Sequence, residues 1–100
     1  MYNQGQKIKY MEDKGILTQR ELTFFFNKIE DVEKGLGKDL SEFSLDEIKY
    51  ALSHAKPKNE KQSKVYCSFI NGYHRWVKNN DDNLFKGVEK GFYDQFVKSL

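Results

Sequence analysis

The sequence has little cysteine, little proline and no long apolar run, and each shortage excludes a class of protein. A single cysteine, Cys67, cannot form an internal disulfide and cannot by itself supply a cysteine-based zinc site. No apolar run exceeds three residues, which is too short for a transmembrane span. The opening residues, MYNQGQKIKY, lack the apolar stretch of a signal peptide, so we expect a cytoplasmic protein with no membrane partner.

Motifs that carry chemistry are also missing. The glycines occur singly, without the spacing of a phosphate-binding loop. Cys67 has no histidine at a convincing spacing, so we expect it to be a small residue beside an apolar stripe. The stretch NNDDN at 79–83 lacks the alternating ligands and the terminal glutamate of an EF-hand. We therefore predict no catalysis, metal site, cofactor or small-molecule substrate.

The composition of the 100 residues predicts one folded domain. Apolar residues make up 38% of the chain and aromatic residues 15%, which is enough for a single modest core. The 17 basic and 15 acidic side chains give a formal net charge of +2, which selects no partner. Only the local distribution of charge can indicate what the protein binds.

Helical periodicity dominates the sequence, and the strict alternation typical of strands is rare. Thr18 and Glu21 have capping-box spacing and predict the start of a helix over 18–37. Gly35 and Gly37 should end it, because glycine accepts the left-handed conformation of a helix end. The apolar stripe of this helix comprises Leu22, Phe25, Phe26, Ile29, Val32 and Leu36.

A second capping box, Ser44 and Glu47, opens a helix that Pro57 ends. Leu40 and Phe43 should anchor the linker before it onto the bundle. Its apolar stripe comprises Leu45, Ile48, Ala51, Leu52 and Ala55. Further helices are predicted over 59–80, over 87–100, and around 8–11 with a stop at Gly15. We predict an all-α fold, a compact bundle of four to five short helices in one domain over residues 1–100.

The most unusual stretch is HAKPKNEKQSK, residues 54–64, which holds four lysines, one glutamate and the chain's one proline. On the helix that follows, aromatic and aliphatic residues fill one arc, and polar residues fill a separate arc without an acidic residue. The lysines of the turn lead into that polar arc. We call the whole set the basic band: Lys56, Lys58, Lys61, Lys64, Ser68, Asn71, Arg75 and Lys78.

Two interpretations of the basic band are open. Any helix of a bundle shows water a polar face, and lysine is common there. A surface of one sign that begins at a helix N-terminus, where free amides and the helix dipole favour phosphate, instead indicates contact with nucleic acid.

Phe24 lies off the apolar stripe of its predicted helix, with Arg20, Lys28 and Asp31 on its own side. A further helix, such as the N-terminal one, would cover it, because small bundles seldom leave a large aromatic side chain in water. Alternatively, Phe24 is an anchor for contact with another protein.

Two long stretches lie on either side of the lysine-rich turn, LTQRELTFFFNKIEDVEKGLGKDLSEFSLDEI and SKVYCSFINGYHRWVKNN. Together they resemble the N-terminal core-binding (SAM-like) domain of phage integrases, the tyrosine recombinases, over about residues 10 to 98. The resemblance rests on apolar spacing, on GKDL before EI, and on a tyrosine and a tryptophan late in the second stretch. It implies a module that clamps double-stranded DNA, together with a separate catalytic domain, during site-specific recombination in a bacterium or phage-infected host.

The resemblance also implies which residues meet the DNA, and it implies other recombinase protomers as partners. The residues implied at phosphates are Lys56, Lys58, Lys61 and Lys64. Those implied near base edges are Asn59 and Gln62, and those implied at a second contact are Thr18, Gln19 and Arg20. Arg75, from the basic band, completes the predicted DNA-binding residues.

The catalytic motif of that family is missing. Its members cut DNA with a tyrosine supported by arginines and a His-x-x-Arg motif in the second domain. Here neither His54 nor His74 is followed by arginine at that spacing. We therefore predict a DNA-binding domain without its catalytic domain. The alternative is a small phage-encoded protein-interaction module or inhibitor that keeps the bundle fold without recombinase activity, with Phe24 in the contact.

Overall fold

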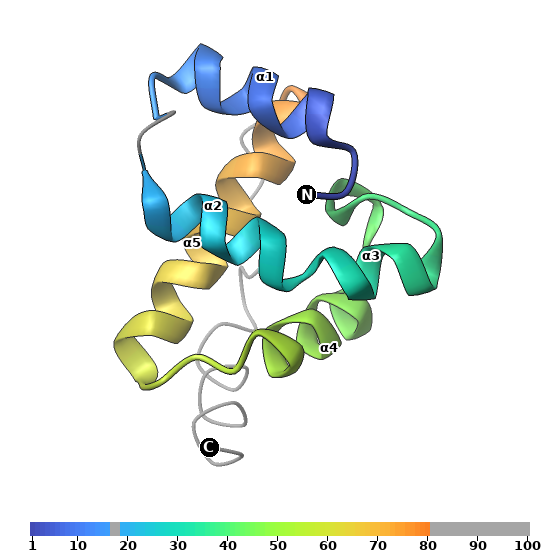
Figure 1. Ribbon diagram of the computed structural model, residues 1–100, viewed down its shortest axis with the longest axis vertical. Helices are drawn as coiled ribbons and strands as arrows, with labels where there is room; N and C mark the ends of the chain where they lie inside the picture. The colour runs from blue at the N-terminus through green and yellow to red at the C-terminus, as the bar shows by residue number, and fades with distance from the viewer. Residues whose placement is uncertain (17–18, 81–100) are drawn as a thin grey trace.

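The computed structural model describes residues 1–16 and 19–80, and these residues form helices without a strand among them. The all-α prediction is confirmed. Thr18 and the helix predicted over 87–100 lie outside the described residues. In the described part, no helix is long and apolar enough to cross a membrane. The elements are α1 (Gln4–Lys14), α2 (Arg20–Lys28), α3 (Glu30–Leu36), the 3-10 helix η1 (Leu40–Glu42), α4 (Leu45–Ala55) and α5 (Glu60–Lys78) (Figure 1).

The long helix predicted over 18–37 is wrong as a single element, because it divides into α2 and α3 at Ile29. Ile29 leaves the helical conformation at φ −90° and ψ 0°. Its side chain is fully buried, and Phe26 and Val32 on either side are buried as well. The break thus lies inside the core and has no proline or glycine to signal it. Gly37 ends α3 in the left-handed conformation, as predicted, whereas Gly35 lies within α3 and does not end it.

The capping box predicted at Thr18 and Glu21 is wrong, because α2 begins at Arg20 and its N-cap is Gln19, whose side chain makes no cap hydrogen bond. The predicted end of α1 and the predicted start of α4 agree with their local signals. Ser44 and Glu47 make both bonds of the predicted capping box at the start of α4. Gly15 ends α1 at φ 68°, and Asn59 caps α5. The N-terminal helix is longer than expected, since it reaches from Gln4 to Lys14.

The core lies where α2 crosses in front of α5, with α1 above and α4 below in the view of Figure 1. Phe25 of α2 contacts Tyr66 and Phe69 of α5, with ring centroids 4.7 and 6.0 Å apart. Leu40 and Phe43 are buried, so their predicted anchoring role is confirmed. Leu36 and Leu45 were placed on apolar stripes but are 41% and 40% exposed, because each occupies the end of a helix.

A buried charge cluster attaches α1 to the rest of the bundle. The ammonium group of Lys7, which is fully buried, donates to Glu33 Oε2, to Asp39 Oδ1 and to the carbonyl oxygen of Tyr2, each over 2.7 Å. The Tyr73 hydroxyl of α5 donates to Asp39 Oδ2 over 2.9 Å. We call these side chains the Lys7 cluster: Lys7, Glu33, Asp39 and Tyr73.

The two carboxyl groups of the Lys7 cluster have opposite pKa shifts. Burial raises the pKa of Glu33 to about 7, and the hydrogen bond from Lys7 offsets only part of that effect. The buried Oε1 of Glu33 has no hydrogen-bond partner among the described residues, which adds to the cost of its charge. Burial also acts to raise the pKa of Asp39, but hydrogen bonds from Lys7 and Ser41 outweigh it and the pKa is lowered.

Candidate nucleic-acid interface

The turn between α4 and α5 is fixed by its own hydrogen bonds. After α4 ends, Lys56 takes the left-handed conformation at φ 51°, and Pro57 is buried. Asn59 Oδ1 accepts from the backbone N–H of Gln62 over 2.9 Å. In return, Gln62 Oε1 accepts from the backbone N–H of Lys58 over 2.7 Å. These paired bonds hold the start of α5 and the preceding chain in one conformation.

Three lysines of this turn present unneutralised charge. Lys56, Lys58 and Lys61 are exposed, and none of them has a carboxylate within ion-pair distance in the part of the chain that the structure describes. Lys64 is also exposed, but its ammonium lies 3.4 Å from Glu60 of the same helix. We call Lys56, Lys58 and Lys61 the basic turn. It lies at the N-terminus of α5, where the helix dipole also favours an anion.

Asn59 and Gln62, which were predicted near base edges, are brought together at the same place. Their side-chain oxygens are used by the cap of α5. Only their amide nitrogens could therefore donate to a base without breaking the cap.

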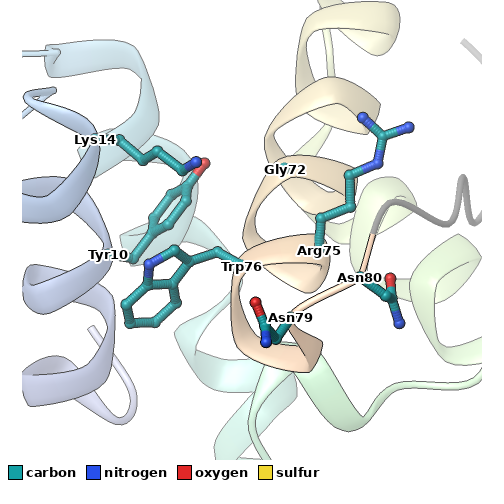
Figure 2. Close-up of a pocket in the computed structure, with 7 residues that line it drawn as sticks. All are labelled: Tyr10, Lys14, Gly72, Arg75, Trp76, Asn79 and Asn80. Carbon is teal, nitrogen blue, oxygen red and sulfur yellow. The ribbon is translucent and has the colours of Figure 1, made fainter.

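The C-terminal half of the basic band has a different environment. Lys78 donates to Glu42 of η1, so this charge is neutralised by a neighbouring element. Arg75 lines a pocket of about 450 Å³ between α1 and α5 (Figure 2). The basic band therefore divides into the basic turn at one end of α5 and a mixed polar surface at the other. The pocket is lined by Tyr10, Lys14, Gly72, Arg75, Trp76, Asn79 and Asn80.

Gly72 of α5 lines this pocket and contributes no side chain to it (Figure 2). A Cβ atom there would lie 3.0 Å from the hydroxyl oxygen of Tyr10. The Trp76 indole N–H donates to the Asp13 carboxylate over 3.1 Å. The pocket thus lies at the C-terminal ends of α1 and α5, and its charged lining residues are Lys14 and Arg75.

The second predicted DNA contact lies at the start of α2. Gln19 and Arg20 are exposed. Helices α2 and α5 both begin at the left edge of the molecule in Figure 1, and their sides meet through Phe25 and Tyr66. The start of α2 and the basic turn thus lie on one side of the bundle.

The first interpretation of Phe24 required another helix to cover it. This is wrong, because the side chain is 62% exposed. Its neighbour on the next turn of α2 is Lys28, whose ammonium lies 5.1 Å from the centre of the Phe24 ring. The same ammonium donates to the carbonyl oxygen of Ala55, directly before the basic turn, over 3.3 Å. Sequence reasoning did not select Lys28 for the site, although the i, i+4 spacing from Phe24 indicates their contact.

The described residues contain no cluster of histidine, cysteine or acidic side chains suited to a metal ion. Cys67 is 1% exposed and lies in the core, as expected for a small residue beside the apolar stripe.

Comparison with known proteins identifies one family. The family model described as MrpR, N-terminal core-binding domain, matches residues 1–79. No curated protein and no solved structure shows a significant match to the chain. The matched range includes α1 to α5, the start of α2 and the basic turn.

Proposed function

Because this chain belongs to the MrpR N-terminal core-binding domain family, a family of recombinase core-binding domains, we propose that it binds double-stranded DNA through the basic turn. The observation that carries the proposal is the set of three exposed lysines, free of carboxylate partners among the described residues, at the capped start of α5. Lysines that contact phosphates neutralise the charge of the DNA backbone, and the cap of α5 fixes the part of the protein backbone from which these lysines extend.

The proposed interface has two parts on one side of the bundle. Lys56, Lys58 and Lys61 contact phosphates, and Lys64 joins them when its exposed pair with Glu60 opens, which costs little at the surface. Arg20 and Gln19 at the start of α2 form the second contact. Together the basic turn and the start of α2 bind one face of a duplex, as one half of a phage-type integrase clamp.

In this proposal the chain is one DNA-binding domain over residues 1–100, and it works in the cytoplasm of a bacterium or an infected host. It performs no chemistry. Cleavage and joining of DNA would need a catalytic domain of the recombinase class, and other protomers would contact this one on the DNA.

The test is fluorescence anisotropy with a mixed-sequence duplex over a range of salt concentrations. Four phosphate contacts, from the basic turn and Lys64, predict that the logarithm of the binding constant falls against the logarithm of salt with a slope of about −3.6. The variant Lys58→Glu with Lys61→Glu should lose binding, because two attractive contacts become repulsive.

A matched variant separates local contact from net charge. Lys9→Glu with Lys34→Glu changes the net charge by the same amount on exposed residues of α1 and α3. It should retain most of the affinity. A salt slope near zero, or an equal loss of affinity in both double variants, would show that the basic turn is not the DNA contact.

A further inference from the structure

We propose that Phe24 and Lys28 form a stacking site for an unpaired DNA base beside the duplex held by the basic turn. This inference rests on the proposed function and adds unpaired DNA to the forms of DNA that the domain binds. We call Phe24 and Lys28 the stacking site.

The geometry places an open aromatic ring next to the basic turn. Phe24 is 62% exposed. The Lys28 ammonium connects the ring to the turn, because it lies 5.1 Å from the ring centre and donates to the Ala55 carbonyl oxygen over 3.3 Å. It also lies 6.0 Å from the ring of Tyr66, which is buried. Lys28 is therefore held between α2, α4 and α5, and the ring beside it is in a defined place.

The charges around the ring favour a polyanion over a protein. The Lys28 ammonium lies over the ring, and Arg20 precedes Phe24 by one turn of α2. Two acidic residues lie near Phe24 in sequence: Glu21, one turn before Phe24 on α2, whose charge acts on Tyr66, and the exposed Asp31 of α3. The centres of protein interfaces are depleted in lysine, whereas binding sites for single-stranded nucleic acid combine cations with exposed aromatic rings.

The exposed ring of Phe24 favours an unpaired base, because stacking needs a base with a free face. Inside a duplex, both faces of every base are covered by the neighbouring base pairs. Only an unpaired or terminal base has a free face that can stack on Phe24. The lysines of the basic turn would hold the adjoining phosphates, and stacking on an aromatic side chain accepts any base.

The test uses the whole chain and three DNA probes with equal duplex regions. The first is blunt. The second carries a short unpaired single-stranded extension, and the third carries an extension of the same length with abasic nucleotides, which keeps the phosphates and removes the bases. The protein should bind the second probe about tenfold more tightly than the third.

Variants assign that preference to the ring. Phe24→Ala should remove the preference for bases over abasic nucleotides, while Phe24→Trp should keep it. Neither should unfold the protein, because the ring is mostly exposed. Tyr50→Ala is the matched control, since Tyr50 is also 62% exposed but stacks on His54, and no ammonium lies over its ring among the described residues.

The outcomes separate this inference from the proposed function. Tight binding to blunt duplex with no preference between the second and third probes refutes the stacking site alone. A preference that survives Phe24→Ala, or is lost equally in Tyr50→Ala, also refutes it. Failure to bind any probe refutes both proposals, and a stable complex with a protein that Phe24→Ala abolishes would assign the ring to a protein contact instead.

Discussion

Replacement of Lys7 by methionine should destabilise the fold strongly, although methionine fills nearly the same volume. The change leaves the Glu33 and Asp39 carboxyl groups buried without their shared cation. Removal of one partner from a buried ion pair typically costs about 3–5 kcal/mol. Glu33, with its pKa raised to about 7 by burial, can take up a proton at neutral pH. We therefore expect the lower end of this range, about 3 kcal/mol of unfolding free energy.

Urea unfolding at pH 7 measures this loss directly. The single tryptophan, Trp76, bonds to Asp13 of α1 and lies 5.5 Å from the Tyr10 ring, so its fluorescence reports whether α1 is docked. With a denaturant slope of about 1.5 kcal/mol per molar, the midpoint should fall by about 2 M.

Two further variants make that measurement decisive. Lys9→Met removes an exposed lysine from the same helix and should change the free energy by less than about 0.5 kcal/mol. Adding Glu33→Gln to Lys7→Met removes one of the stranded carboxylates and should restore part of the stability. If Lys7→Met costs less than about 1 kcal/mol, the buried ammonium does not stabilise the docking of α1 in the way the contacts indicate.

Two other predictions concern single buried groups. The raised pKa of Glu33 means that the folded state keeps a proton which the unfolded state has lost between about pH 4.5 and about pH 7, so the unfolding free energy should fall as pH rises through this window, by at most about 3 kcal/mol. In Glu33→Gln this fall should disappear from a series of urea titrations, and an unchanged pH profile would contradict the shift. Gly72→Ala should cost about 1 kcal/mol or more in thermal melts, because its Cβ would lie 3.0 Å from the Tyr10 hydroxyl. The same substitution in a Tyr10→Phe background should cost less, and an equal cost in both backgrounds would show that this contact is not the cause.

Local signals in the sequence predicted several of the helix ends. The capping box of Ser44 and Glu47 and the stop at Gly15 depend on residues within one turn of each other, so their spacing carries the information. The cap of α5 by Asn59 is equally local but was not predicted. The division at Ile29 could not be predicted, because it arises from how the core accommodates a buried side chain.

For the candidate site, too, the sequence predicted the local features and missed the contacts between distant residues. The lysines of the basic turn follow from one short stretch and the helical period. The neutralisation of Lys78 by Glu42 depends on a contact across 36 residues, which periodicity cannot reveal. The Lys7 cluster was missed for the same reason, since its carboxylates are 26 and 32 residues away and a lysine near the N-terminus is usually solvated.

The Lys7 cluster also constrains the order in which the chain can assemble. A lysine cannot give up its water until both of its counter-ions are in position. We therefore expect the segments that carry Glu33 and Asp39 to meet before α1 docks onto them, which would make the first helix along the chain one of the last to fold. Removing this leading segment would take away the cation that both acids share and would uncover the apolar surface on which Tyr10 and Met11 pack.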